Sequence, residues 1–252
     1  MTDDEVIRLC SLIWNGKKLR NLADPRMGKD DTWHDIILAC EEVVLDMVRL
    51  SLTSSLKGSR CGIVRRCAID HAIRGVTNSP CLYTRPLYVS EGHLLRIAEA
   101  ETAMLATPGR RRTVREPSCR EEHVVPLAVD ASGRKILEDP EGHLRRVRRK
   151  FMSPVCIVTP DEDLELTRIK DRLKGHERPN RPFQRYADVA DIRLTRNGAR
   201  IDPASFTFRD HLREMSMQPA YATAVPLFAS GSRHWVAALA ALRRDVRTPR
   251  CP

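Results

Sequence analysis

Several features that identify common protein classes are missing from this sequence. No apolar run approaches the roughly 18–20 residues that a membrane-spanning helix needs. The acidic start Met1-Thr-Asp-Asp-Glu differs from the basic start of a secretory signal peptide. The glycines form neither a P-loop nor a dinucleotide-binding pattern, and there is no internal repeat or nucleophile elbow. We therefore expect a cytoplasmic protein without a membrane segment.

The cysteines do not form a framework. There are 8 of them, and they contain no C-x2-C pair. Zinc ribbons and fingers need such close pairs to build a tetrahedral site, so no structural zinc is expected. In a cytoplasmic protein these cysteines are expected to be reduced thiols, some of them small core residues.

Positive charge is in excess. The 252 residues include 43 Lys and Arg against 33 Asp and Glu, a net charge of +10, and 35 of the positive residues are arginine. Arginine binds phosphate through a bidentate fork, so this excess favours an anionic partner such as nucleic acid. Codon bias in a GC-rich genome explains the same composition equally well.

Hydrophobic periodicity and capping residues predict both helices and strands. Strands are expected around Val124 and at 155–159. The stretch at 76–89, with Pro80 and Pro86, favours loop or short extended pieces, and prolines also interrupt the chain after 175. Helices are expected at 4–14, about 31–50, about 60–74, 91–106 behind the cap Ser90, 140–151, 160–173 and 232–245.

The stretch Glu121-Glu122-His123-Val124-Val125-Pro126 combines residues that suit hydrolysis of a phosphodiester. A carboxylate binds a hard divalent cation through oxygen. A neighbouring imidazole can deprotonate water and direct it at phosphorus. A second ligand has to come from elsewhere, and the acidic helix start at 161–163, after the second expected strand, is a suitable place.

Residues 122–126 resemble the acidic-His-hydrophobic-x-Pro motif of the HNH, or His-Me finger (ββα-metal), endonucleases. The resemblance covers roughly residues 119–175. It implies that Glu122 binds a metal ion and that His123 is the general base. The family's last helix commonly supplies a His or Asn ligand, which Glu162 or Asp163 replaces here. Mg²⁺ is the implied cofactor, and Mn²⁺ can substitute for it.

Each of these residues also has an ordinary structural explanation. His123 fits a half-buried strand histidine, and Glu122 fits a solvated charge at a strand end. Thr159-Pro-Asp-Glu162 matches a capping box, which explains Glu162 without a metal. The aromatic and arginine cluster at 182–186 is typical of a small helix packed on the core.

Two basic clusters flank the motif and are expected to contact phosphates without reading base sequence. The alternative is that both are solvated faces of an arginine-rich chain. The residues are Arg110, Arg111, Arg112, Arg115 and Arg120 before the motif, and Arg145, Arg146, Arg148, Arg149 and Lys150 after it.

The sequence thus predicts an α+β fold in three consecutive regions. These are a helical region at 1–106, an HNH-like ββα-metal core with a basic insertion at 107–175, and an α/loop region at 176–252. The expected function is metal-dependent cleavage of nucleic acid, DNA before RNA. Two alternatives stay open: a basic nucleic-acid-binding protein without catalysis, and a helical interaction protein whose charge is compositional. The oligomeric state stays open as well.

Overall fold

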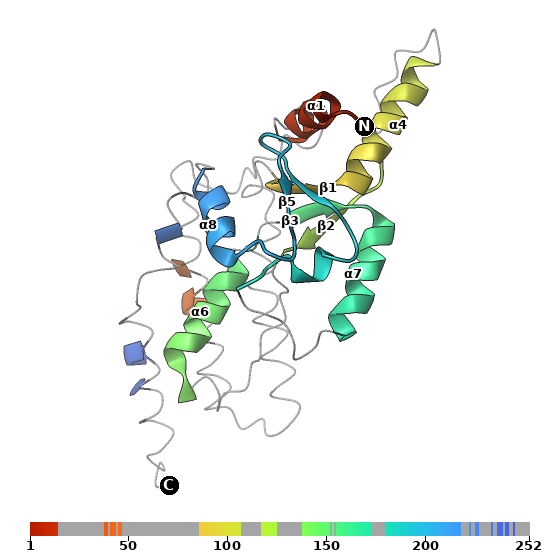
Figure 1. The fold of residues 1–252 in the computed structure, drawn as a ribbon. Helices are drawn as coiled ribbons and strands as arrows, with labels where there is room; N and C mark the ends of the chain where they lie inside the picture. The colour runs from red at the N-terminus through yellow and green to blue at the C-terminus, as the bar shows by residue number, and fades with distance from the viewer. Residues whose placement is uncertain are drawn as a thin grey trace. The chain divides into compact units, whose positions relative to one another are not determined.

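The computed structural model describes residues 1–14, 86–106, 117–124, 138–151, 153, 155–172 and 180–217, with scattered positions in 38–46 and 222–244 (Figure 1). The chain forms two compact units, each assembled from three separate stretches. The first unit contains 1–23, 83–125 and 154–215, and the second contains 24–82, 126–153 and 216–252. The three consecutive regions expected from the sequence stay a prediction.

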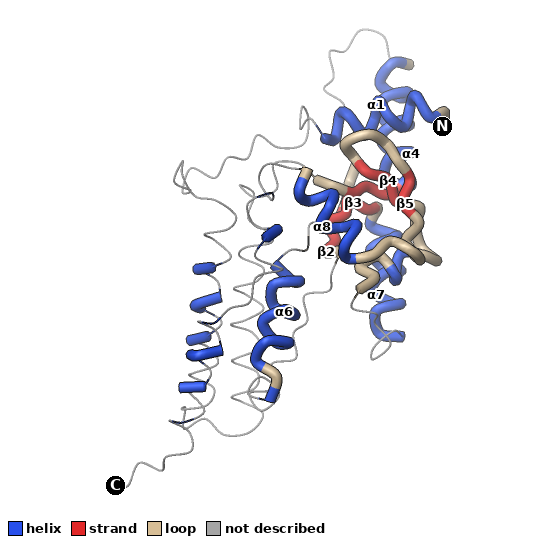
Figure 2. The backbone as a smooth tube through the Cα atoms, turned by 60° about the vertical axis from the view of Figure 1, so that its left-hand side comes forward, coloured by secondary structure: helices blue, strands red, loops and turns tan. Residues whose placement is uncertain are grey.

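The first unit is built on a five-stranded mixed sheet, which Figure 2 shows with helices on either side. Strand β1 pairs with β3 in parallel, and every other pair is antiparallel. Helices and a mixed sheet together confirm the α+β class. The strands in spatial order are β2 (Arg120–His123), β3 (Val155–Val158), β1 (Tyr88–Ser90), β4 (Ile192–Leu194) and β5 (Arg200–Ile201).

Four of the expected helices are confirmed, namely α1 (Asp3–Trp14), α4 (Glu91–Leu105), α6 (Pro140–Phe151) and α7 (Pro160–Arg172). The helices expected at about 31–50, about 60–74 and 232–245 lie outside the described residues apart from scattered positions. The sequence did not predict β4, β5 or α8 (Phe208–Ser216), and it left the region of β1 open as loop or short extended chain. The small helix expected within 182–186 is the 3-10 helix η1 (Gln184–Tyr186). None of the described helices has the length and apolar character that crossing a bilayer requires.

One face of the sheet is covered by α1 and α4. Val89 and Ile157 are partners across the parallel pair and point to this face, where they pack with Leu9, Ile13 and Leu94. The amphipathic spacing of α1 supplies its apolar stripe. Helix α4 begins directly after β1 because the Ser90 side chain accepts a hydrogen bond from the backbone N–H of His93 at 3.1 Å.

The opposite face carries an aromatic core. Tyr88 points to it, because neighbouring strand residues alternate, and its ring packs edge-on against Phe183 with centroids 4.6 Å apart. The Tyr88 hydroxyl lies 2.7 Å from Nδ1 of His211 on α8, and both side chains are fully buried. This face therefore joins η1 and α8 to the centre of the sheet.

Strands β2 and β3 form an antiparallel pair, and α7 follows β3 directly. Glu122 lies opposite Cys156, and His123 lies opposite Val155. Helix α7 contacts both β2 and η1. The register places Val158, two residues before α7, opposite Arg120, so α7 begins at the Arg120 end of β2 and contacts that strand.

In the second unit, α6 is the longest described element. Leu144 and Val147 are buried on one side of it, and Arg145 and Arg146 are exposed. Arg148 is buried and forms an ion pair with Glu41, with Nε 2.6 Å from Oε1. The helix is therefore amphipathic, as its alternation of arginines and apolar residues predicts.

Candidate functional site

The carboxylate of Glu122 is held by two side chains from η1. Nη2 of Arg185 and the hydroxyl of Tyr186 both donate hydrogen bonds to its Oε2. The Glu122 side chain is 14% exposed and that of Arg185 is 7% exposed. A strand-end glutamate that the sequence leaves as either a solvated charge or a ligand is in fact part of a largely buried network.

Burial sets the direction of the proton affinities in this network. It raises the pKa of the Glu122 carboxyl, while Arg185 and Tyr186 oppose that shift. Burial also raises the pKa of the Tyr186 phenol well above its ordinary value, and the charge of Glu122 adds to the effect. Tyr186 is therefore a donor to Glu122 at neutral pH and is not itself a base.

His123 is half-buried at the end of β2. Its backbone carbonyl accepts a second hydrogen bond from Nη2 of Arg185. Because side chains alternate along a strand, the imidazole of His123 and the carboxylate of Glu122 start from opposite faces of the sheet. Strand β2 is an edge strand of the described sheet, so side chains on both faces of β2 lie beside the same sheet edge.

Glu162 has the structural role that the capping box predicts. Its backbone N–H donates to the Thr159 hydroxyl at 3.2 Å, and its Oε2 accepts the Thr159 backbone N–H at 2.7 Å. The hydroxyl of Ser90 donates to the same Oε2 at 2.6 Å. Glu162 thus links the start of α7 to the end of β1.

Two electrostatic effects connect the three predicted metal ligands with the region of Glu122 and Cys156. The charge of Asp163 raises the pKa of Glu122, in addition to the larger effect of burial. Burial, followed by the charges of Glu122 and Glu162, raises the pKa of the Cys156 thiol far above its usual value. Of the three, Asp163 is half-buried in the first turn of α7, and the capping box there is formed by Thr159 and Glu162.

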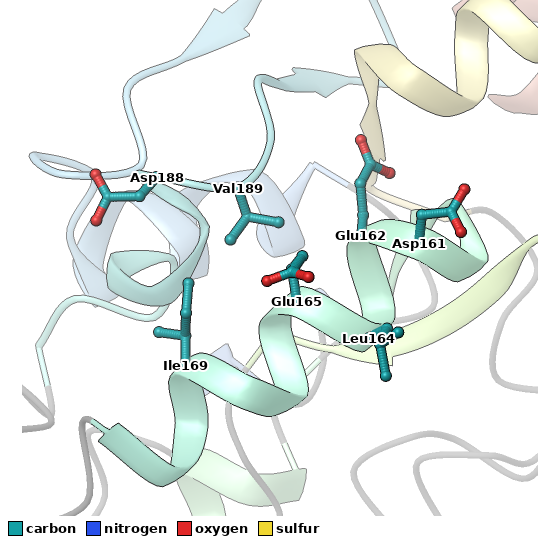
Figure 3. Close-up of a pocket in the computed structure, with 7 residues that line it drawn as sticks. All are labelled: Asp161, Glu162, Leu164, Glu165, Ile169, Asp188 and Val189. Atoms are coloured by element: carbon teal, nitrogen blue, oxygen red, sulfur yellow. The ribbon is translucent and has the colours of Figure 1, made fainter.

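A separate acidic cavity of about 360 Å³ runs beside α7 (Figure 3). Its carboxylates do not converge: in Figure 3 Asp161 and Glu162 point away from Glu165 and Asp188. Asp161 pairs with Arg96 at 2.6 Å, and Glu165 pairs with Arg168. The lining comprises Asp161, Glu162, Leu164, Glu165, Ile169, Asp188 and Val189, so the Glu122–His123 strand end is not part of it.

Within the described residues, no group of three or more His, Cys, Asp or Glu side chains is arranged to hold a metal ion. The pair formed by Glu122 and Asp163 falls below that number. Mg²⁺ usually keeps several waters and binds through one or two carboxylates and the substrate phosphates. A pair of carboxylates therefore fits this cation, whereas it does not fit a fully protein-enclosed zinc site.

The basic residues predicted to contact phosphate differ in exposure and in ion pairing. Arg120 is exposed on β2, and Arg145 and Arg146 are exposed on α6. Arg148 is engaged by Glu41, and burial together with the charge of Arg145 lowers the pKa of the half-buried Arg149. The side chain of Lys150 and all of Arg110, Arg111, Arg112 and Arg115 lie outside the described residues.

Sequence reasoning missed the role of Arg185 and Tyr186. The cluster at 182–186 was expected to pack a small helix on the core, and η1 does pack there through Phe183 and Tyr186. Arg185 and Tyr186 also contact Glu122, which lies 63 and 64 residues earlier in the sequence. This contact depends on the tertiary fold. The only local signal was an arginine beside aromatic residues that are typical of a core. An arginine buried among such residues needs an anionic partner.

Comparison of the chain with protein-family models, curated proteins and solved structures finds no match. The function is therefore inferred from the residues of this chain and their contacts.

Proposed function

We propose that this protein is a Mg²⁺- or Mn²⁺-dependent endonuclease that hydrolyses phosphodiester bonds in nucleic acid, DNA in the first instance. The observation that carries the proposal is the meeting of β2, β3 and α7, where the charge of Asp163 on α7 adds to the raised pKa of the Glu122 carboxyl. An antiparallel strand pair followed by a helix is the element order of the ββα-metal core. The first two residues of the acidic-His-hydrophobic-x-Pro motif, Glu122 and His123, end its first strand.

Glu122 and Asp163 are the residues that would hold the cation. When bound, the ion would neutralise charge on the phosphate and stabilise the leaving oxygen. The low exposure of Glu122 favours this role, because an interaction between a carboxylate and a cation is stronger where water is largely excluded. Glu162 is left out of the proposed ligand set, because the capping box with Thr159 and the hydrogen bond from Ser90 explain its position without a cation.

His123 is the proposed general base. His123 is half-buried, and an imidazole is the side chain that most often acts as a general base. Because β2 is an edge strand, a phosphodiester that lies along this edge can be reached from both faces. The bond from Arg185 to the His123 carbonyl holds the backbone from which the imidazole projects.

Exposed arginines are the proposed contacts to the phosphate backbone. Arg120 is two residues from Glu122 on the same face of β2, so a phosphate it binds is close to the proposed cation. Arg145 and Arg146 on α6 offer further contacts. Arg148 is left out, because a buried ion pair with Glu41 occupies it.

A second candidate is a nucleic-acid-binding protein without catalysis. One observation favours it: the charge of Glu122 is already balanced by Arg185, and its Oε2 also accepts a hydrogen bond from the Tyr186 hydroxyl. Such a protein would keep its salt-sensitive binding. Each phosphate contact removed from duplex DNA would reduce the slope of log K against log salt by about 0.9, and no product would form with any metal.

The experiment is a nicking assay on supercoiled plasmid and on single-stranded DNA, with Mg²⁺, Mn²⁺ or chelator. Glu122→Gln and Asp163→Asn should each lower cleavage by about 100-fold or more, as expected for loss of a charge-stabilising ligand. The matched controls are Glu121→Gln, one residue away and exposed, and Glu165→Gln, exposed on α7. Both controls should retain cleavage.

Two outcomes would reject the proposal. Salt-dependent binding with no metal-dependent product would favour the non-catalytic candidate. Equal loss of cleavage in the exposed controls and in the two site variants would mean that the assay reports folding and not a cation site.

A further inference from the structure

Arg185 contacts the carboxylate of Glu122, which is the group that a cation at this site would have to bind. Its Nη2 donates to Oε2 of Glu122 and to the carbonyl of His123. Both members of the ion pair are largely buried, with side-chain exposures of 7% and 14%. The negative charge of Glu122 is therefore balanced from within the protein before any metal arrives.

We infer that Arg185 is an internal competitor for the cation: it occupies Glu122 in the metal-free protein, and binding of Mg²⁺ or Mn²⁺ to Glu122 requires that the guanidinium be displaced. This inference rests on the proposed function, since it takes Glu122 as a cation ligand. It adds regulation of the same site, because cation loading then depends on an ion pair that the protein itself supplies.

The guanidinium of Arg185 and a divalent cation are like charges, and Glu122 lies where little water screens them. A guanidinium and a divalent cation on the same carboxylate repel each other, and the repulsion is large where water is scarce. The cation must therefore break an existing buried ion pair, whose loss exposes a charge that needs a new partner. Tyr186 does not create the same conflict, because its hydroxyl is neutral and can keep donating to Oε2.

After the Arg185 guanidinium leaves Glu122, it can keep one hydrogen-bond partner. Its bond to the His123 carbonyl does not involve the carboxylate. Arginine presents five N–H donors in a fixed fork, so one donor can stay on that carbonyl while the others turn toward another acceptor. The displaced charge then stays beside the strand end, where the account places the phosphate.

The first test is a titration of the full chain with Mn²⁺, followed by calorimetry. Arg185→Gln removes the competing charge and should bind Mn²⁺ about tenfold more tightly than wild type, or tighter still, as expected when a contacting positive charge is removed. The matched control is Arg200→Gln, which removes an exposed arginine of β5 at the other edge of the sheet. Its Mn²⁺ affinity should equal that of wild type.

The outcomes separate the inference from the proposed function. If Glu122→Gln abolishes Mn²⁺ binding and Arg185→Gln binds no more tightly than wild type, the competition is refuted and the cation site survives. If neither wild type nor Arg185→Gln binds Mn²⁺, or if Glu122→Gln leaves binding unchanged, both are refuted. Tighter binding in Arg185→Gln alone supports the inference.

A second measurement uses the wild-type protein and so does not depend on the folding of a variant. Phenylglyoxal modifies accessible arginines, and peptide mass spectrometry reports the rate at each position. Saturating Mg²⁺ should accelerate modification of Arg185, which is buried in its ion pair without metal, and leave Arg200 unchanged. A rate at Arg185 that Mg²⁺ does not raise would overturn the inference.

Discussion

Glu122 lies directly opposite Cys156 in the antiparallel pairing of β2 with β3. The two side chains share the face of the sheet that η1 covers, and the thiol is fully buried. A carboxylate placed beside a buried thiol disfavours the thiolate. This relationship gives the cysteine a chemical property that can be measured separately from any activity.

Cys156 is expected to resist alkylation in the folded protein. Burial, together with Glu122 and Glu162, raises the pKa of its thiol well above the usual value, and burial raises that of Cys10 to about 11. Since only the thiolate reacts, iodoacetamide at pH 8 should modify the half-buried Cys119 before Cys10 and Cys156, the other two cysteines that the structure describes. Peptide mass spectrometry over time measures the order. Rapid labelling of Cys156 without denaturant would contradict its placement.

His93 should make the protein acid-sensitive. Its ring is fully buried in α4, and neither ring nitrogen has a hydrogen-bond partner among the described residues. Burial lowers its pKa to about 4, and the charge of Arg96 acts in the same direction. The unfolded chain takes up this proton near pH 6.5, so the contribution to stability is present above that pH and is lost as the pH falls toward 4.

The measurement for His93 is urea unfolding at pH 7 and pH 4.5, in wild type and in His93→Leu. Wild type should lose more free energy of unfolding between the two pH values than the variant, by up to about 3 kcal/mol. The variant retains every other titrating group, so the difference isolates His93. Equal losses would show that His93 is not the acid-sensitive residue.

Tyr88→Phe should destabilise the first unit without disturbing its aromatic packing. The change removes the hydroxyl that lies 2.7 Å from Nδ1 of His211 in a fully buried setting. Loss of one partner from a buried hydrogen bond costs about 1–3 kcal/mol. Thermal or urea unfolding followed by near-UV circular dichroism measures the cost. An unchanged midpoint would mean that the hydrogen bond does not link α8 to the sheet.

Arg148 and Arg145 should differ sharply although they are neighbours on α6. Arg148→Ala leaves the buried Glu41 unpaired and should cost about 3–5 kcal/mol, whereas the exposed Arg145→Ala should change stability by about 0.5 kcal/mol or less. Denaturant unfolding of both variants makes the comparison. Similar stabilities would contradict the assignment of Arg148 to the core of the second unit.

The parts of the fold that depend on local signals could be predicted from the sequence. The Ser90 cap before α4 and the Thr159–Glu162 capping box before α7 are motifs of a few residues, and both have the expected hydrogen bonds. Helix α8 carried such signals too. Thr207 and Asp210 exchange hydrogen bonds at its start, and Phe208, His211 and Met215 share its buried side.

The parts that depend on pairing between distant segments could not be predicted. Strands β1, β4 and β5 are two or three residues long, too short for an alternating pattern, and their partners determine them. For the same reason, the sequence identifies Glu122 and His123 as a motif but does not identify Arg185 as the partner of Glu122. That contact exists only because η1 packs beneath the sheet.

Cleavage of supercoiled plasmid in Mg²⁺ by wild type and by His123→Ala side by side, with added imidazole, tests the proposed hydrolysis. Wild type should nick the plasmid in a reaction that chelator abolishes. His123→Ala should be about 100-fold or more slower, and free imidazole acting as the missing base should partly rescue it. Nicking of equal rate in both proteins, or none in wild type with any divalent metal, would contradict the proposal.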